Sequence, residues 1–399
     1  MEKRLYWRHL PMLGALAVAL AGCSASKTGG GQLTGPLAES AWSASQWISA
    51  KNAPVVSGKV QGDNERAADG ASWFASTIKN EQRVVKAKWM TAGLGVYELY
   101  VNGKRVGQEM LKPGFTHYAK TKLSFTYDIT GMLARKAGAA NTLSVQSTPG
   151  WWADKIITPG GHDGMIGKKP AFRGVVELTY ADGSKQLYGT GTSTWKAGVC
   201  GPVRHAAIFD GEEYDARIQP GFDTPALLST PEENHEFQGQ ILPTDGAEIY
   251  LREDLALAPV RAYTWQGVTG NTQDEYGKVV IKQEFSRGET LVVRPGETLV
   301  VDFGQNCAAV PAFEFTAGEG TQLTCLPSEL LNDGNGAKSR GMDGPEGSAH
   351  RLNLRIPDIG MRLTYTFAGG GKPERFMPRS TFFGYRLVSI TATGEVHIK

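Results

Sequence analysis

The sequence has almost no surplus of charge and little helical periodicity, and each shortage argues against a class of protein. Lys+Arg (42) and Asp+Glu (40) nearly cancel, so the chain lacks the positive charge that neutralises a phosphate backbone. Leu-rich stretches of helical period are scarce after residue 30, and 50 glycines and 20 prolines interrupt the 399 residues. We therefore expect neither a nucleic-acid-binding protein nor an all-α fold. The charge balance favours a neutral or polar small molecule or polymer as partner.

Cysteines are few, and common catalytic and metal-binding motifs are missing. The four cysteines show no C-x-x-C spacing, and the sequence has neither an H-E-x-x-H motif nor a D-x-D-x-D-G calcium loop. Three cysteines lie in the main part of the chain, at Cys200, Cys307 and Cys325. We expect them to be small buried side chains, with a disulfide between Cys307 and Cys325 on neighbouring strands as the alternative. No residue is predicted to be catalytic.

Only one long apolar run is present, and it lies near the N-terminus. Basic residues precede an apolar run over residues 10–20, which is too short to span a membrane comfortably. The sequence LAGC at residues 20–23 resembles the box at which bacterial lipoproteins are cleaved and lipidated. We predict a lipoprotein signal peptide over residues 1–22, lipid attachment at Cys23 and a flexible tether over residues 23–40. The protein would then be exported and anchored to a bacterial membrane in the cell envelope; ordinary secretory cleavage is the alternative.

The sequence does contain many short apolar or alternating runs separated by turn residues, a pattern typical of stacked antiparallel sheets. Residues 84–90 and 97–101 are predicted strands, and an Asn-Gly pair at residue 102 favours a tight hairpin turn. Residues 175–180 and 185–188 repeat this arrangement around an Asp-Gly turn. Later runs predict further strands at residues 278–285, 290–293, 297–303, 313–316, 321–326 and 385–392.

These strands predict an all-β fold of two consecutive sandwiches of the jelly-roll type. The first is predicted over residues 41–218 and the second over residues 261–399. Residues 219–260 include a polar, proline-bearing stretch with neither strand nor helix period. We interpret this stretch as a linker or an extended crossover.

Five sequence motifs occur in a recognisable order. Three lie in the first predicted sandwich: GLGVYELYVNGKRVG (residues 93–107), PGFTHY (113–118) and DGEEYDAR (210–217). Two lie in the second: DFGQN (302–306) and PRSTFFGYR (378–386). The first three resemble the N-terminal β-domain of bacterial α-L-rhamnosidases, glycoside hydrolase family 78. The last two are similar to the concanavalin-like β-sandwich that follows in that family.

The resemblance implies an accessory role. In that family the concanavalin-like domain leads into an α/α barrel that carries the acidic residues for inverting hydrolysis. The sequence ends at Lys399, where that barrel would begin, and no residue matches its catalytic acids. Inversion needs a protonated and an ionised carboxyl about 6.5–9.5 Å apart across the sugar. We therefore expect a non-catalytic, carbohydrate-binding portion that acts on rhamnose-containing oligo- or polysaccharides and is inactive as a glycosidase alone.

Two alternative functions stay open. In one, the chain is part of an inverting α-L-rhamnosidase that is active only with a separate or lost catalytic barrel as its partner. In the other, it is a structural or interaction lipoprotein whose second sandwich exposes an apolar patch where a barrel once packed.

The predicted sugar-binding residues are Trp151, Trp152 and Asp154. An exposed indole stacks on the C–H face of a sugar, and a nearby carboxylate accepts hydroxyl protons. The alternative is that one indole fills the sandwich core while the other packs against the neighbouring domain. Some domains of the resembled type bind L-rhamnose with a calcium ion, so His162 and Asp163 are predicted as its ligands.

One motif contains a dense acidic group that could be mistaken for a catalytic pair. Adjacent residues of a strand point to opposite faces, so Glu212 and Glu213 cannot readily flank one bond. We predict structural roles here, with Arg217 pairing an acidic side chain to fix the last strand of the first sandwich.

Overall fold

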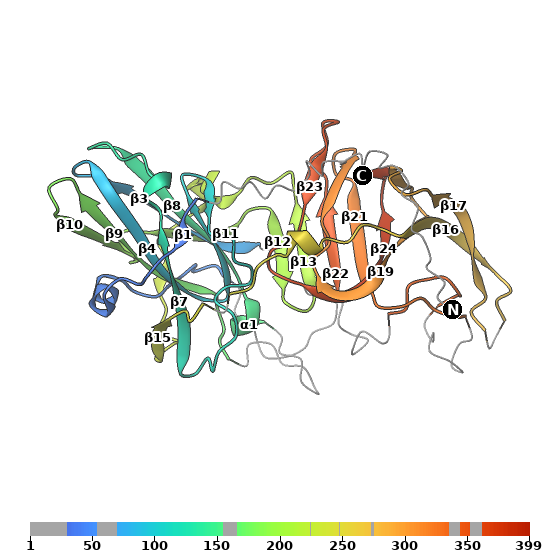
Figure 1. The fold of residues 1–399 in the computed structure, drawn as a ribbon, viewed down its shortest axis with the longest axis horizontal. Coiled ribbons are helices and arrows are strands. Elements are labelled where there is room, and N and C mark those ends of the chain that lie inside the picture. Colours follow the sequence, from blue (N-terminus) through green and yellow to red (C-terminus); the bar gives the residue numbers. More distant parts are fainter. Residues whose placement is uncertain are drawn as a thin grey trace, which may run out of the picture.

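The computed structural model describes residues 30–53, 70–154, 166–223, 225–246, 248–272, 275–334, 344–351 and 361–399. It contains two β-sandwiches that lie beside one another along the longest axis (Figure 1). The prediction of an all-β fold with two sandwiches is therefore confirmed. The predicted signal peptide and Cys23 lie outside the described residues. Helices are short: α1 (Gly150–Ala153), η1 (Glu39–Ala44), η3 (Thr130–Met132), η4 (Gly221–Asp223), η5 (Pro225–Leu227) and η6 (Glu253–Leu255).

The first sandwich consists of an eight-stranded and a five-stranded sheet. The larger sheet has the order β1-β7-β4-β9-β2-β14, with β10 paired to β9 and β15 paired to β7. The smaller sheet has the order β11-β3-β8-β5-β6. The strands are β1 (Gln32–Leu33), β2 (Ile48–Ser49), β3 (Ala71–Lys79), β4 (Val84–Leu94), β5 (Val96–Val101), β6 (Lys104–Val106), β7 (Thr121–Asp128), β8 (Ala140–Thr148), β9 (Ala171–Tyr180), β10 (Lys185–Gly189), β11 (Lys196–Cys200), β14 (Glu232–Glu233) and β15 (Gln240–Pro243).

Both hairpins predicted for this sandwich are present. Val101 and Lys104 pair across the turn between β5 and β6. The two turn residues, Asn102 and Gly103, have φ values of 50° and 73°. Positive φ at both central positions is what a type I′ turn requires, and Asn-Gly adopts it at little cost. The second predicted hairpin joins β9 and β10, which pair antiparallel.

The core of the first sandwich lies between its two sheets. Phe172 of β9 contacts Trp89 of β4 edge-on at 6.2 Å and Phe74 of the smaller sheet at 6.0 Å, measured between ring centroids. Alternate residues of β5 enter this core. Glu98 and Tyr100 of β5 therefore lie on the outward face of the smaller sheet, which faces the second sandwich.

The second sandwich consists of an eight-stranded sheet, β12-β13-β22-β21-β24-β19-β16-β17, and a four-stranded sheet, β18-β25-β20-β23. Its core contains the aromatic rings of Phe315, Tyr365 and Phe367, whose centroids lie 4.6–5.0 Å apart. The strands are β12 (Val203–Ala207), β13 (Gly211–Asp215), β16 (Arg261–Thr269), β17 (Lys278–Phe285), β18 (Leu291–Val293), β19 (Thr298–Ala309), β20 (Phe313–Ala317), β21 (Gln322–Ser328), β22 (Arg362–Thr366), β23 (Glu374–Phe376), β24 (Phe383–Ala392) and β25 (Val396–Ile398).

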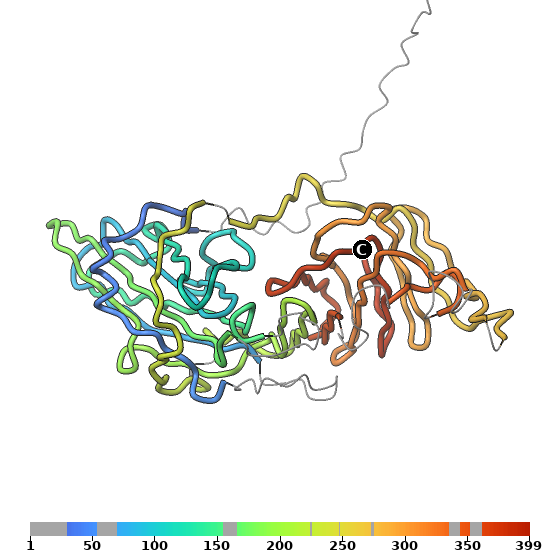
Figure 2. Tube along the Cα trace, turned by 90° about the horizontal axis from the view of Figure 1, so that it is seen from below, coloured from blue at the N-terminus to red at the C-terminus, as the bar shows by residue number. Residues whose placement is uncertain are grey.

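The chain passes between the two sandwiches three times. After β11 it enters the second sandwich, where β13 pairs in parallel with β22. It then returns to the first, where β14 pairs with β2 and β15 with β7, before β16 begins the rest of the second. Figure 2 shows the yellow segment running along the first sandwich before it crosses back.

This strand pairing differs from the predicted division into residues 41–218, 219–260 and 261–399. β12 and β13 belong to the second sandwich, and the predicted linker supplies two short strands to the first. Part of the predicted tether is also in a sheet, because β1 pairs with β7. Periodicity indicates that a segment is extended but not which sheet it joins. The partner of β13 lies far later in the chain, so the local pattern could not indicate it.

The three described cysteines are free thiols. Cys200 and Cys325 are buried, as predicted, whereas Cys307 is partly exposed. Cys307 lies on β19 and Cys325 on β21, and both strands pair with β24, which lies between them. Strands lie about 4.8 Å apart, so an intervening strand places the two cysteines beyond disulfide range. The alternative of a Cys307 to Cys325 disulfide is therefore wrong. In the described part of the chain, no helix is long and apolar enough to cross a membrane.

Candidate functional site

Trp152 is a core residue next to α1. Its side chain is 2% exposed, and its Nε1 donates a hydrogen bond to the carbonyl of Lys169 at 3.0 Å. Its ring contacts Tyr118 and Phe237 edge-on, and Nζ of Lys122 lies 4.4 Å from its centroid. This indole therefore packs inside the protein and presents no open face for stacking.

Trp151 and Asp154 lie nearer the surface. Trp151 is partly buried and meets Phe115 edge-on at 6.3 Å, and the Phe115 side chain is 63% exposed. Asp154 accepts a hydrogen bond on Oδ2 from the N–H of Ile208, at 3.0 Å. Trp151 also packs against Ile208, which precedes β13. Trp151 and Phe115 thus form a partly exposed aromatic edge, and a sugar contact at Trp151 or Asp154 stays a prediction.

His162 and Asp163 lie outside the described residues, so the predicted calcium site stays a prediction. Within the described ranges, no three or more His, Cys, Asp or Glu side chains are grouped so that they could hold a metal ion.

A cleft of about 260 Å³ lies between the two sandwiches. One wall is the outward face of the smaller sheet of the first sandwich. There Trp73, Gln146 and Glu98 occupy paired positions on the adjacent strands β3, β8 and β5. Glu212 and Tyr214, two residues apart on β13, contribute to the opposite wall. Because residues two apart on a strand share a face, both side chains reach the cleft together.

Aromatic rings line the cleft on both sides. Trp73, Tyr100 and Phe222 form a cluster on the first sandwich, with centroid distances of 5.3–5.7 Å. Tyr214 and Phe376 lie 5.4 Å apart on the second. Ligand sites are commonly built in this way, with apolar rings around a small number of placed polar groups.

Glu98 is the buried carboxylate of the first wall. The guanidinium of Arg105 donates to both of its oxygens, from Nε to Oε2 and from Nη2 to Oε1. Arg379 of the second sandwich lies 3.7 Å from Oε1 through its Nη2. Burial alone would raise the pKa of Glu98, but the charges of Arg105, Arg379 and Lys112 outweigh it and lower the pKa to about 2. Glu98 is therefore ionised at neutral pH.

Glu212 is the buried carboxyl group of the second wall, and its environment is different. Its Oε2 accepts hydrogen bonds from the backbone N–H groups of Arg379 and Ser380, both at 3.1 Å. Burial raises the pKa of Glu212 to about 7, although these N–H groups and the Arg379 guanidinium act to lower it. Near neutral pH this carboxyl group is thus partly protonated.

The other acidic residues of this motif have structural partners. Glu213 points away from Glu212, and its Oε1 lies 3.7 Å from Nη2 of Arg362. Arg217 pairs with Asp215, with 2.7 Å between Nη2 and Oδ2. The expectations that Glu212 and Glu213 diverge and that Arg217 pairs an acid are therefore confirmed.

Three motifs that are far apart in the sequence meet at the cleft. Glu98 belongs to the motif at residues 93–107, Glu212 and Tyr214 to the motif at 210–217, and Arg379 to the motif at 378–386. The sequence alone does not indicate the cleft. Alternation along β5 places Glu98 and Tyr100 on one face, but only the tertiary fold indicates that this face is covered by β13 and Arg379.

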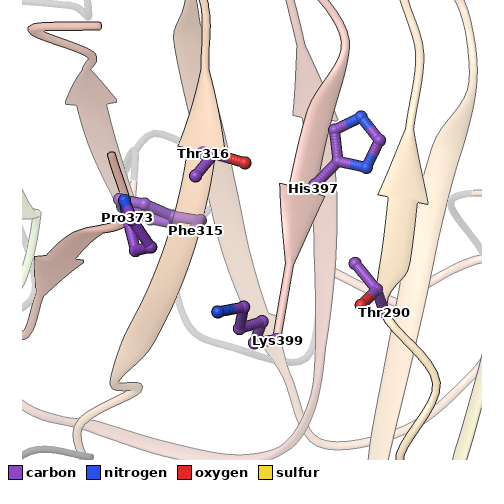
Figure 3. Close-up of a pocket in the computed structure, with 6 residues that line it drawn as sticks. All are labelled: Thr290, Phe315, Thr316, Pro373, His397 and Lys399. Carbon is purple, nitrogen blue, oxygen red and sulfur yellow. The ribbon is translucent and has the colours of Figure 1, made fainter. Parts of the chain in front are cut away.

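A second cavity, within the second sandwich, is too small for a sugar. It has a volume of about 30 Å³, and its lining residues come from β20, β25 and the neighbouring segments (Figure 3). They are Thr290, Phe315, Thr316, Pro373, His397 and Lys399. A space of this size holds about one or two water molecules.

Two stretches of the chain match domains of known proteins. Residues 82–243 match the α-L-rhamnosidase N-terminal domain, and residues 292–398 match the bacterial α-L-rhamnosidase concanavalin-like domain. An α-L-rhamnosidase of Streptomyces avermitilis is 30% identical over 358 residues, which are 88% of this chain and 28% of that protein. One of Alteromonas sp. (strain LOR) is 27% identical over 356 residues, covering 89% of this chain and 33% of that protein.

Solved structures agree with these matches. The native α-L-rhamnosidase of Aspergillus terreus has a TM-score of 0.66 at 21% identity, covering 89% of this chain and 36% of that one. The S. avermitilis α-L-rhamnosidase complexed with L-rhamnose has a TM-score of 0.57 at 27% identity, covering 82% and 28%. The chain spans about a third of the length of the curated relatives it matches. The chain therefore contains an α-L-rhamnosidase N-terminal domain and a bacterial α-L-rhamnosidase concanavalin-like domain.

Proposed function

We propose that the chain is a non-catalytic, carbohydrate-binding accessory portion of an α-L-rhamnosidase-like protein, and that it holds rhamnose-containing glycans in the cleft between its sandwiches. The observation that carries the proposal is the combination of aromatic rings with buried carboxyl and guanidinium groups around one cleft. It is supported by the relatives, which are named α-L-rhamnosidases, one of them seen with L-rhamnose.

The chemistry of the cleft suits a sugar. A pyranose presents C–H groups on its faces and hydroxyl groups around its edge. Tyr100 and Phe222 offer ring surfaces for the faces, and Gln146, Glu98 and Arg379 offer acceptors and donors for the edge. Because Glu98 is held between two guanidinium groups, it needs little rearrangement to accept hydroxyl protons.

The test is a calorimetric titration of the purified chain with L-rhamnose and rhamnosylated oligosaccharides, with and without calcium. Saturable binding that is lost in Tyr100→Ala and kept in Arg252→Gln, a change at the exposed arginine that precedes η6, would support the cleft as the site. Binding lost only in Trp151→Ala would move the site to the aromatic edge with Phe115. Absence of binding in folded protein would contradict the proposal.

A second candidate function is a part of an α-L-rhamnosidase that works with a separate catalytic barrel. It is favoured by the matched relatives, because they are about three times as long as the region they share with this chain. A chromogenic α-L-rhamnoside assay, with the chain alone and with a candidate barrel from adjacent DNA, separates the two. Hydrolysis only in the mixture would favour this candidate.

The proposal also includes the cell envelope as the location, with lipid on Cys23. Incorporation of labelled fatty acid into the wild-type chain, and its loss in Cys23→Ala, is the expected result. Equal labelling of both chains would contradict it.

A further inference from the structure

The guanidinium group of Arg379, which lines the cleft, has donors without hydrogen-bond acceptors. Its Nε and Nη2 are buried and have no hydrogen-bond partner among the described residues. The Glu98 oxygen is 3.7 Å from Nη2, which is an ion-pair distance but too long for a hydrogen bond. Buried guanidinium donors without acceptors are costly, and such groups are rare in folded proteins without a reason.

The neighbouring charged groups are already engaged elsewhere. Glu98 accepts two hydrogen bonds from Arg105. Arg375, the other arginine of the cleft, pairs with Glu314 outside it, with 2.8 Å between Nη2 and Oε2. Glu212 directs Oε2 at two backbone N–H groups rather than at the Arg379 guanidinium. An acceptor that fully satisfies Arg379 is therefore missing from the described side chains of the cleft.

The geometry of the two unpartnered donors limits which acceptor can satisfy them. Nε and Nη2 form one edge of the guanidinium, and their two N–H bonds are parallel. A carboxylate accepts both at once, with one oxygen on each donor, whereas a single hydroxyl group can accept only one well. Burial keeps Glu212 partly protonated near neutral pH, so its charge only partly cancels that of Arg379.

Aromatic rings lie close to this guanidinium. Tyr100 and Phe222 line the same cleft as Arg379, and their ring centroids lie 5.3 Å apart. A six-membered sugar ring against Tyr100 and Phe222 would bring a substituent at its edge toward Arg379.

We propose that the cleft binds a carboxylate-bearing sugar, a hexuronate residue, through bidentate hydrogen bonds from Arg379 with the sugar ring on Tyr100 and Phe222. This inference rests on the proposed carbohydrate-binding function and adds the ligand class. The guanidinium turns into the cleft to meet the ligand, since its Nε and Nη2 are covered in the unliganded protein.

The test uses matched ligands with the full-length purified chain at about pH 6. Methyl α-D-galacturonoside, its methyl ester and acetate are titrated separately by calorimetry. We expect the acid to bind about tenfold or more tightly than the ester, because its carboxylate accepts two charge-assisted hydrogen bonds from Arg379. We expect acetate to show no saturation, because it lacks the sugar ring that stacks on the aromatic side chains. Equal affinity for acid and ester, or saturable acetate binding of similar strength, would overturn the inference.

Variants assign the effect to the arginine. Arg379→Gln is expected to reduce the acid-to-ester ratio to about 1, and Arg379→Lys to retain part of it because the charge stays while the fork is lost. If Arg379→Gln does not fold, Glu212→Gln provides an independent test. It should keep the acid preference at about pH 8, where ionised Glu212 weakens the preference of the wild type. Arg252→Gln is the matched surface control.

The two proposals fail in different ways. Saturable L-rhamnose binding without any preference for the acid overturns the hexuronate inference and leaves the proposed function intact. Preference for the acid that survives Arg379→Gln and Arg379→Lys unchanged also overturns it. No binding of any sugar overturns both.

Discussion

Arg379 of the second sandwich lies 3.7 Å from Glu98 of the first, measured from Nη2 to Oε1. Its backbone N–H meanwhile donates to Glu212 on β13. One residue thus contacts both buried carboxyl groups of the cleft, one through its side chain and the other through its main chain. Of these two contacts, only that with Glu98 joins the two sandwiches, because Glu212 and Arg379 both belong to the second.

Glu98 should stabilise the folded protein at neutral pH and lose this contribution in acid. Its pKa is about 2 in the folded protein against an ordinary value of 4.5, so its contribution is complete above pH 4.5 and is lost as the pH falls toward 2. We expect Glu98→Gln to lower the free energy of unfolding at pH 7 by on the order of 3 kcal/mol and to flatten its decline in acid. Urea denaturation at several pH values measures this. An unchanged acid profile would contradict the prediction, and Glu253→Gln on the surface is the control.

Lys122 should destabilise the protein at neutral pH. Burial lowers its pKa to about 6, although the rings of Tyr118 and Trp152 partly favour the cation. The unfolded chain binds the proton more tightly, so stability should rise between pH 6 and 10.5. Lys122→Met should raise the free energy of unfolding at pH 7 by on the order of 2–3 kcal/mol and reduce this rise, to which Lys112, whose pKa burial lowers to about 8, contributes at higher pH. Thermal unfolding across this pH range measures it, with exposed Lys185→Met as the control; a wild-type curve without slope would refute it.

The two adjacent tryptophans should differ in their effect on stability. Trp152→Ala removes a buried ring and is expected to cost about 3–5 kcal/mol. Trp151→Ala removes a partly exposed ring and should cost clearly less. Chemical denaturation of both variants tests this. Equal losses would mean that Trp151 is as important for packing as Trp152, and that it is a poor probe of sugar contact.

Gly211 should be indispensable at the junction of β13 and β22. Its φ is 102°, and a Cβ there would lie 1.8 Å from the carbonyl oxygen of Arg362. Gly183 also has a positive φ, of 85°, but a Cβ there would meet no atom within 4 Å. We expect Gly211→Ala to cost about 2–3 kcal/mol more than Gly183→Ala, because only the first must displace a backbone. Similar unfolding midpoints for the two variants would argue against the parallel pairing of β13 with β22.

The sequence predicted local structure well and long-range pairing poorly. The run at residues 278–285 coincides with β17, and the Asn-Gly pair marks the hairpin of β5 and β6, because both signals are complete within a few residues. The assignment of β13 to the first sandwich was wrong for the opposite reason. What decides it is the fit of Gly211 and Tyr214 against β22, a strand that begins at Arg362.

The residues of the candidate site likewise could not be predicted from local sequence signals. Trp151 and Trp152 attract attention as adjacent indoles, yet in the structure Trp152 is buried and Trp151 is partly exposed. Glu98 and Arg379 attract none individually, since a single acid or arginine in a strand motif is usually solvated or paired, and Glu212 is predicted to have only a structural role. Only the meeting of three distant segments turns them into the polar lining of a cleft.

Because the chain passes between the sandwiches three times, the gene cannot be cut into two parts that each encode a complete sandwich. A breakpoint anywhere between residues 201 and 260 would deprive one sandwich of strands that the other half of the gene encodes. Neither half can therefore be transferred alone, and recombination that preserves the fold has to move both sandwiches together. The cleft, which requires both walls, would then be gained or lost as a single heritable unit.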